Sequence, residues 1–265
     1  MIETALLGVG LHGPGMAGWA HGGAVLAGRA PYNAAETPAP QPENLSPRER
    51  RRVSQAVRLA LAVGQEAVAH ARVDPADLPS VFGWAHGDGS TVQRILIELA
   101  TEERHVSPKD FHHSVHNVAV GYWAIATGCH RACTSVTAAR DTFAATLVKA
   151  MAQVRGDGDP VLLVLCDTPF PEPLNTVCPV GAPLGVGLVL APAGTPGAKA
   201  TLRADFQAGA VEPTPPDLPA LHELWRQNAA ARALPLLAGL ARGAPTRQAL
   251  PYGDRAHLEL ELDPC

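Results

Sequence analysis

The chain has 265 residues, of which 46% are hydrophobic, and its formal net charge is −4. This length and composition are typical of one large globular domain, or of one domain with an appendage, that buries a substantial core. Apart from residues 50–52 there is no run of Lys or Arg, so the charge pattern argues against a nucleic-acid partner. No apolar segment reaches the ~18 residues that a membrane span needs, so we expect no membrane partner either.

The first residues and the cysteines together predict a cytoplasmic location. The opening "MIETALLGVGLHGPG" has no basic region and carries Glu3 before its apolar run, which is not the pattern of a signal peptide. The five cysteines are odd in number and irregularly spaced, which favours reduced thiols over a disulfide framework.

The first third of the chain predicts two strands and two helices. Residues 4–11 read as a buried strand that ends at a Gly/Pro turn, and residues 31–47 as an irregular loop rich in Pro, Ala and Asn. Ser46, followed by Pro47 and Glu49, forms a capping-box pattern that starts a helix running to about Ala71. A strand at 80–86 and an amphipathic helix at 90–103 follow.

The middle of the chain predicts strands that alternate with helices. We expect a mostly buried helix at 112–127, a strand at 133–138, a helix at 140–154 and a continuous apolar strand at 159–167. Residues 185–192 and 200–206 are predicted to pair as a β-hairpin. This alternation is typical of a layered α/β sheet.

The composition changes after about residue 206. A Pro-rich connector, "VEPTPPDLP", leads to an Ala/Leu-rich helical region at 218–242 and a final strand at 255–263, whose alternation predicts one wet face. We therefore predict a main domain over residues 1–206 and a C-terminal appendage over 207–265 that packs on it.

The stretch "CTSVTAARDTFAATL", residues 133–147, has the outline of a strand that turns sharply into a helix. Enzymes often place a nucleophile at such an elbow, because its side chain is exposed and the helix N-terminus stabilises negative charge. Here the turn reads Thr137, Ala138, Ala139, Arg140, and none of these four is a cysteine or a serine.

Histidines gather in "HVSPKDFHHSVHN". His112 and His116 have the four-residue spacing that places two imidazoles on one helix face for zinc. His113 stands where the metalloprotease pattern needs Glu, and no carboxylate follows nearby, so we expect no metal. The alternative is a polar helix N-terminus in which His116 and Asn117 bond to neighbouring backbone.

Two further features each allow two interpretations. "HGDGS", residues 86–90, lies at the end of a predicted strand and is either an anion-binding loop or a turn. Cys133 is either a nucleophile or an inert thiol buried in its strand.

The central region resembles the N-terminal half of β-ketoacyl synthases of the thiolase superfamily. Ser107-Pro108 precedes Asn117 by the family's spacing, and the Gly-x-x-x-Ile-x-x-Gly helix is matched by Gly121, Ile125 and Gly128. Residues 135–138 fit the family's strand before the elbow, and "GDGD" at 156–159 fits the end of the next helix. The resemblance covers about residues 1–206 and implies a thiolase-like half-domain, layered α/β/α around a mixed five-stranded sheet, plus the helical appendage and final strand.

The chain departs from this family at its catalytic residues. The family's catalytic cysteine falls on Ala139 when counted from "GDGD" and on Arg140 when counted from Asn117, and neither side chain can attack a thioester. Active synthases also carry two histidines in their C-terminal half, in motifs of the types His-Gly-Thr and Asn-x-Phe-Gly-Phe-Gly-Gly. The only histidines here beyond residue 206 are His222 and His257, and neither stands in such a motif.

The resemblance therefore implies a chain-length-factor type of protein from aryl-polyene and related type II polyketide systems. It implies a subunit that lacks the catalytic cysteine and has no cofactor, which forms a heterodimer with an active β-ketoacyl synthase and meets an acyl carrier protein indirectly. The residues expected to line the partner interface or tunnel are Phe111, His112, His116, Asn117, Trp123, Cys133, Thr134, Ser135, Val136 and Thr137.

Two other functions remain open at this point. One is a small acyl-transfer or decarboxylating enzyme that uses Cys133 or a histidine of 112–116. The other is a homodimeric scaffold or carrier-protein-binding module, for which the arginine-rich segment 48–58 would be the contact. A half-length thiolase fold would also expose Phe143, Leu147 and Met151 unless residues 218–242 or a partner cover them, and we expect the appendage to cover part of this face.

Overall fold

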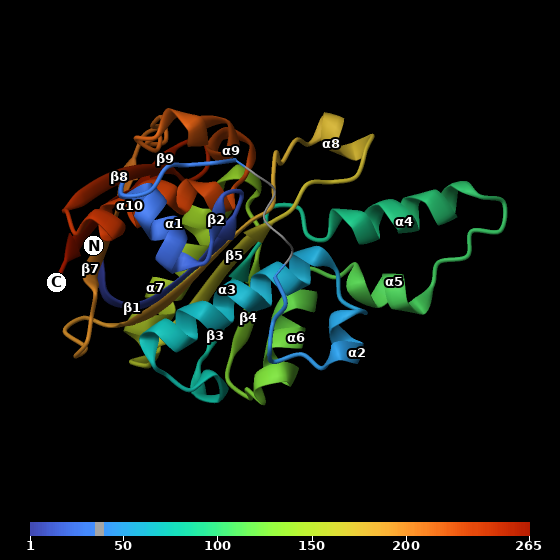
Figure 1. Cartoon of the computed structure of the whole chain (residues 1–265), viewed down its shortest axis with the longest axis horizontal. Helices are drawn as coiled ribbons and strands as arrows, with labels where there is room; N and C mark the ends of the chain where they lie inside the picture. Colours follow the sequence, from blue (N-terminus) through green and yellow to red (C-terminus); the bar gives the residue numbers. More distant parts are fainter. Residues whose placement is uncertain (35–39) are drawn as a thin grey trace.

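The computed structural model describes residues 1–34 and 40–265, and within them the chain forms one mixed sheet with helices on both faces (Figure 1). The sheet has nine strands in the order β4-β3-β5-β6-β1-β7-β9-β8, with β2 paired to β1. The strands are β1 (Ile2–Gly13), β2 (Met16–Ala17), β3 (Ser80–Gly83), β4 (Cys133–Val136), β5 (Val161–Asp167), β6 (Leu184–Pro192), β7 (Ala200–Ala208), β8 (Thr246–Pro251) and β9 (Ala256–Pro264).

Ten α-helices are found in the described residues, together with four short 3₁₀ turns. The helices are α1 (Trp19–Leu26), α2 (Pro47–Arg50), α3 (Gln55–Ala71), α4 (Gly89–Ala100), α5 (Pro108–His113), α6 (Val118–Thr127), α7 (Thr142–Asp157), α8 (Leu174–Val177), α9 (His222–Gln227) and α10 (Leu234–Arg242). None of them combines the length and the hydrophobicity that crossing a membrane requires.

Successive residues of the central strands enter two different cores, one on each face of the sheet. Leu6 of β1 packs in the core beneath α7 and α10, while its neighbour Leu7 packs in the core beneath α3 and α6. Leu163 and Leu162 of β5 divide in the same way. Because side chains alternate along a strand, an apolar run such as β5 must be covered on both faces.

Glycines let α3 lie directly on the sheet. A Cβ at Gly8 would stand 2.1 Å from the carbonyl oxygen of Ala67, and one at Gly187 would stand 2.3 Å from that of Val63. Any side chain at these two positions would push α3 away from β1 and β6, so the glycines in "GVG" of each strand set the spacing of this layer.

The sheet is wider than predicted, since it has nine strands and not five. The short β2 and the strand β8 were not predicted, and β9 pairs with β7 along its whole length, so the last residues of the chain extend the same sheet. The number of strands could not be predicted from the resemblance to half of a thiolase fold. Pairing between segments that are distant in the chain has no signature in the local sequence.

The predicted hairpin of 185–192 with 200–206 is wrong. Both strands exist, as β6 and β7, but β1 lies between them and is antiparallel to each. The connection through residues 193–199 therefore carries the chain past β1 and does not form a tight turn.

Two predicted helices are each divided. The capping box at Ser46 is confirmed, with Ser46 Oγ accepting from the Glu49 backbone at 3.3 Å, but α2 ends at Arg50 and Ser54 caps a new helix, α3. The predicted helix at 112–127 is in fact α5 and α6, separated by residues 114–117. The predicted loop at 31–47 contains residues 35–39, which lie outside the described residues.

The apolar face of α7 is not exposed. Phe143, Leu147 and Met151 are fully buried, in one core that also contains Leu234 and Leu237 of α10. Residues of the segment 218–242 therefore belong to the same core as α7.

Candidate functional site

The turn between β4 and α7 is a strained elbow centred on Ala139. Ala139 has φ of +48°, one of three non-glycine residues with positive φ in the described chain. Thr142 stabilises the turn, because its Oγ1 accepts from the Ala138 backbone at 3.1 Å and donates to the Ala139 carbonyl at 2.7 Å. A left-handed non-glycine residue costs ~1–2 kcal/mol, and such strain gathers at functional sites. The nucleophile-elbow geometry is present, and its side chain is a methyl group.

A pocket of about 200 Å³ lies beside this elbow. The elbow contributes Ala139 and Arg140, and the carboxyl end of β5 contributes Asp167. The remaining walls are Ala85, His86, Val177, Cys178, Pro179, Val180, Arg226, Gln227, Asn228, Ala229 and Arg232. The pocket therefore has polar groups from distant parts of the chain and an apolar side.

Asp167 is buried in this pocket with one oxygen satisfied. Its side chain is 4% exposed, and its Oδ1 accepts from the Ala85 backbone at 2.7 Å, whereas Oδ2 has no hydrogen-bond partner among the described residues. Burial raises the pKa of this carboxyl to about 7, against the opposing effect of the backbone N–H groups of Ala85, Ala230 and His86. Near neutral pH the group is thus close to half protonated.

Arg232 is a half-buried cation of the pocket. Its guanidinium lies 4.0 Å from the ring centroid of Trp225, and its Nη1 has no partner among the described residues. Burial, and after it the positive charge of Arg140, lower the pKa of Arg232 to about 10, although Asp141 and Glu212 oppose this. The positive charges of Arg140 and Arg232 therefore lie near one another, and the negative charges of Asp141 and Glu212 offset their repulsion only in part.

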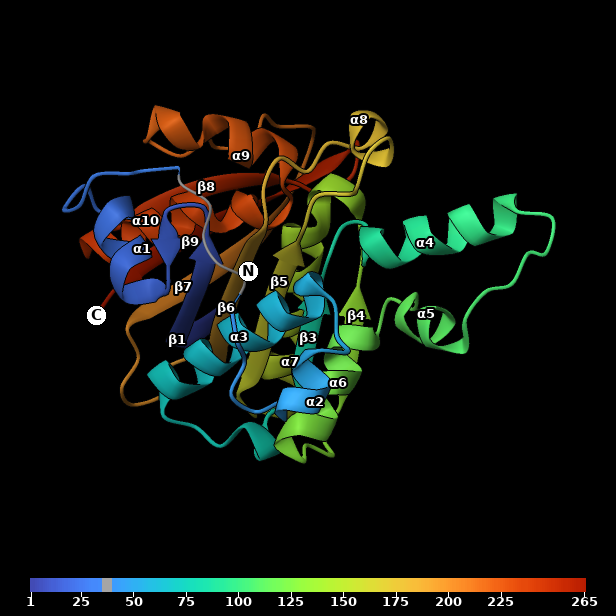
Figure 2. The same ribbon diagram turned by 45° about the vertical axis from the view of Figure 1, so that its right-hand side comes forward.

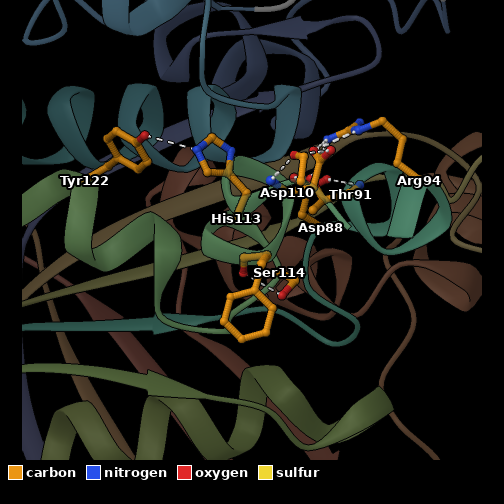
Figure 3. Close-up of polar contacts among 9 residues, drawn as sticks. Asp88, Thr91, Arg94, Asp110, His113, Ser114 and Tyr122 are labelled. Atoms are coloured by element: carbon orange, nitrogen blue, oxygen red, sulfur yellow. Dashed lines mark hydrogen bonds and ion pairs between the residues drawn. The ribbon is translucent and has the colours of Figure 1, made fainter. Parts of the chain in front are cut away.

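A second region, the arm formed by α4 and α5, projects from the body of the molecule on the side away from both termini (Figures 1 and 2). Polar contacts join the two helices (Figure 3). Arg94 of α4 donates to Asp110 of α5 at 2.8 Å and to Thr91 at 2.9 Å, while Thr91 Oγ1 donates to Asp88, the N-cap of α4, at 2.7 Å. The Arg94 guanidinium lowers the pKa of the Asp110 carboxyl. The arm is therefore a defined hairpin of helices.

The residues predicted for a partner interface fall into two groups. Phe111, on α5, is 68% exposed, and His112, His116 and Asn117 are exposed as well. Trp123, by contrast, is completely buried and packs on Phe82 in the core under α3. Its apolar position on α6 was compatible with either place.

The strand residues 133–137 lie at an edge of the sheet. Among the strands of the described residues, β4 pairs only with β3, in parallel, with Cys133 opposite Ser80 and Val136 opposite Gly83. Cys133 is exposed, so the interpretation of it as a buried thiol is wrong; its Sγ accepts from Ser80 Oγ at 3.3 Å. The side chain of Ser135 donates to the His116 carbonyl at 2.7 Å, and Thr137 to that of Ala85 at 3.1 Å.

The histidine cluster does not share one helix face. His112 lies on α5, which ends at His113, and His116 lies in the connection to α6, where its carbonyl also accepts from Trp84 Nε1 at 2.8 Å. His113 contacts the Tyr122 hydroxyl at 3.2 Å (Figure 3). Among residues 1–34 and 40–265, no group of three or more His, Cys, Asp or Glu side chains has metal-binding geometry.

Several features of these regions were not found from the sequence. In "HGDGS", Asp88 serves as the cap of α4. Asp167 and Arg232 were not singled out, although an acid at the carboxyl end of a wholly apolar strand is a signal that points to Asp167. The exposure of three apolar residues of the arm was also not predicted, because the sequence indicated only an amphipathic helix over 90–103. These residues are Leu96, Ile97 and Leu99.

Several solved structures that resemble this chain are ketosynthase assemblies. A ketosynthase in complex with its chain length factor from Xenorhabdus doucetiae matches with a TM-score of 0.75 at 21% identity, over 98% of this chain and 99% of that one. The ishigamide ketosynthase/chain length factor matches with a TM-score of 0.74 at 15% identity, over 100% and 99%. A type II PKS acyl-carrier protein in complex with its ketosynthase matches with a TM-score of 0.76 at 11% identity, over 100% and 99%. These likenesses establish the fold.

No curated protein matches the sequence. The protein-family description "Beta-ketoacyl synthase, N-terminal domain" matches residues 27–235, which is most of the chain and extends across position 206. The chain therefore belongs to the β-ketoacyl synthase N-terminal domain family.

Proposed function

We propose that the chain is a non-catalytic, chain-length-factor-like subunit that pairs with an active β-ketoacyl synthase in cytoplasmic polyketide or fatty-acid-type biosynthesis, such as that of aryl polyenes. The observation that carries the proposal is the elbow at Ala139. The left-handed conformation of Ala139, with φ of +48°, supports the choice of Ala139 over Arg140 as the position equivalent to a nucleophile. A methyl group cannot form an acyl-enzyme, so the turn has the strained backbone conformation but no nucleophilic side chain.

The histidines of the C-terminal region support a non-catalytic role. The His222 ring contacts the Pro216 carbonyl at 2.8 Å, and the His257 ring contacts the Gly209 carbonyl at 2.8 Å. Neither of them lines the pocket beside the elbow, whose one histidine is His86. The part of the chain that the structure describes thus places no pair of imidazoles in the pocket at the elbow to stabilise the enolate of a decarboxylative condensation.

The open edge at β4 supports pairing with a partner through the sheet. The carbonyls of Ala132 and Val136 accept from Ser80 and Trp84 on the β3 side. Because alternate residues of a strand direct their main-chain groups to opposite sides, those of Cys133 and Ser135 face the open edge. An unpaired edge of this kind is a template for a strand of another chain.

The arm next to this edge supports a large apolar contact. The exposed apolar residues of the arm and of α6 are Leu96, Ile97, Leu99, Phe111, Val115 and Ile125. Side chains of this size are seldom left exposed together on a protein that acts alone. With the strand edge, they supply the apolar area and the hydrogen bonds of an obligate interface.

The similar structures contain the kinds of partner that we propose. Two of them describe a ketosynthase with a chain length factor, and the third a ketosynthase with an acyl-carrier protein. We infer that this chain takes the chain-length-factor position and meets the carrier protein through its synthase.

The test is to co-express the chain with an active ketosynthase from the same genome and to measure the mass of the purified complex. We expect a one-to-one heterodimer. Ser135→Pro, which removes one outward-facing N–H, should weaken pairing at least about tenfold, because proline cannot donate to a sheet. Ser135→Ala is the matched control, since it keeps the N–H and loses only the bond to His116.

A monomer that never co-purifies with that ketosynthase would refute the proposal. A homodimer that is likewise weakened by Ser135→Pro would instead favour the scaffold function. Release of CO₂ from a malonyl carrier protein, abolished by Cys133→Ala, would favour the enzyme.

A further inference from the structure

Two cysteines next to the start of β4 lie against the same end of β3. Cys129, in the loop after α6, donates through Sγ to the Leu78 carbonyl at 3.3 Å. Cys133, the first residue of β4, accepts through Sγ from Ser80 Oγ at 3.3 Å. Cys129 Sγ also accepts from the Arg131 backbone at 3.4 Å, so its side chain turns toward the loop that leads to Cys133. Both thiols therefore contact one short segment of three residues.

The two side chains also lie on the same face of the sheet. Side chains alternate along a strand, so Cys133 faces the same way as Ser135, whose hydroxyl donates to the carbonyl of His116 just before α6. Helix α6 packs on β4, and Cys129 directly follows its C-cap, Gly128. Burial raises the pKa of the Cys129 thiol, and the neighbouring Cys133 thiol raises it further. The contacts and the charge interaction thus agree that the two thiols are neighbours.

The two thiols differ in their access to solvent. Cys133 is exposed, whereas Cys129 is buried with 5% of its surface exposed. An oxidant in solution can reach the first thiol, and the second is placed to react with its neighbour, which is the usual division of work in a redox-sensitive pair. Within the described residues no third side chain joins them in a metal-binding geometry, so a disulfide fits this pair better than a metal does.

From these contacts we propose that Cys129 and Cys133 form a reversible disulfide within the chain when hydrogen peroxide oxidises them. The Cys133 thiolate attacks the peroxide, so that an S–O bond forms, the O–O bond breaks and hydroxide leaves. The Cys129 thiolate then attacks the sulfur of the resulting sulfenic acid, so that the S–S bond forms and a second hydroxide leaves. The two protons lost by the thiols convert both hydroxides to water. A small dithiol reverses the reaction and is itself oxidised to a disulfide.

The disulfide should alter the edge of the sheet. Once oxidised, Cys129 has no S–H to donate to the Leu78 carbonyl. To bond at an S–S length of ~2.05 Å, the Cys133 side chain must turn from Ser80 toward Cys129. Cys133 begins β4, and we have assigned its outward-facing main-chain groups to the ketosynthase partner. Oxidation should therefore weaken pairing, a consequence that rests on the proposed function, whereas the disulfide itself does not.

The test is to treat the full chain with hydrogen peroxide, block the remaining thiols with iodoacetamide and digest with trypsin without a reductant. Trypsin cleaves after Arg131, which places the two cysteines in separate peptides, 110–131 and 132–140. We expect mass spectrometry to find these peptides joined in most chains and separate after dithiothreitol. Cys129→Ser and Cys133→Ser should each abolish the joined pair. Cys265→Ser, which removes another exposed cysteine, is the matched control and should retain it.

The affinity for the ketosynthase gives a second readout, with the peroxide removed before the two proteins are mixed. We expect the oxidised chain to bind at least about fivefold more weakly than the reduced chain, as for the loss of about one hydrogen bond. Dithiothreitol should restore the affinity. Cys133→Ser should bind equally well before and after peroxide, whereas Cys265→Ser should lose affinity as the original chain does.

Two results would overturn the disulfide: no joined peptides after peroxide, or Cys133 joined as often to Cys178, to Cys265 or to another copy of the chain. Equal affinities of the oxidised and reduced chains would overturn its effect on the edge of β4. If the reduced chain pairs with no ketosynthase, the proposed function fails, and the joined peptides still decide whether the disulfide forms.

Discussion

The two regions on either side of β4 differ in what they have kept. The elbow and its pocket hold strained backbone, a buried acid and a half-buried arginine, so this region is arranged around polar groups. The arm beside the edge of β4 has exposed apolar side chains. Its two helices are joined by hydrogen bonds such as that from Arg94 to Asp110 (Figure 3). Polar strain is typical of a site for a small molecule, and exposed apolar area is typical of a site for a protein.

The largest expected effect is on the free energy of unfolding, which should depend on pH through the buried carboxyl of Asp167. The pKa of Asp167 is raised to about 7 in the folded chain from 3.8, so folding favours the protonated form. Its contribution is therefore most favourable below pH 3.8 and is progressively lost as the pH rises to about 7, by up to about 4 kcal/mol.

Asp167→Asn removes this dependence while it keeps an oxygen for the Ala85 N–H. The variant should thus gain stability relative to the original chain as the pH rises from 5 to 8, as measured by urea unfolding. A difference in unfolding free energy that stays constant over this range would contradict the burial argument.

A smaller effect, of about 2 kcal/mol in binding, is expected for the arm. Phe111 is 68% exposed on α5, so Phe111→Asp should leave the fold intact and weaken pairing with the ketosynthase by more than about tenfold, as for an aromatic anchor of an interface. Phe206→Asp is the control, because Phe206 is also exposed but lies on β7, away from the arm. Equal affinities of the two variants in surface plasmon resonance would show that the arm is not the contact.

Local features of this fold could be predicted from the sequence, and spatial ones could not. The capping box at Ser46 and the strand β5 have signals within a few residues, and both were predicted. The position of β1 between β6 and β7 depends on pairing across the chain, so the sequence suggested a hairpin instead. The sequence also did not distinguish the exposed Phe111 from the buried Trp123. Both are aromatic residues on neighbouring helices, and their burial depends on how those helices pack.

The site was partly predictable for the same physical reason. A strand followed by Thr137, Ala138 and a helix start predicts an elbow, and the structure adds that Ala139 has the positive φ. Asp167 and Arg232 are about 65 residues apart in the chain and meet only after folding, so no sequence motif joins them. An elbow is formed by consecutive residues, whereas this pocket is lined by residues that are far apart in the chain.

The strain at the elbow predicts an effect of about 1 kcal/mol. Ala139→Gly removes the Cβ that opposes a left-handed conformation, which should stabilise the fold by more than glycine's greater flexibility in the unfolded chain costs. The expected net gain of about 1 kcal/mol is measurable by urea unfolding. Ala138→Gly, at a neighbouring residue with negative φ, should destabilise the chain instead; a loss of stability in both variants would mean that the turn is not strained.

The smallest expected effect is none, and it tests whether the elbow alone makes a synthase. Ala139→Cys restores a thiol at the strained position, but His222 and His257 remain bonded to distant carbonyls and neither of them lines the pocket. With nothing to stabilise the enolate, the variant should show no condensation of malonyl and acyl carrier proteins by product mass spectrometry, although iodoacetamide should label the new thiol as evidence that it is exposed. Arg140→Cys should behave in the same way. Measurable condensation by either variant alone would mean that the chain retains more catalytic machinery than its elbow and histidines indicate, and that its dependence on a partner has been overestimated.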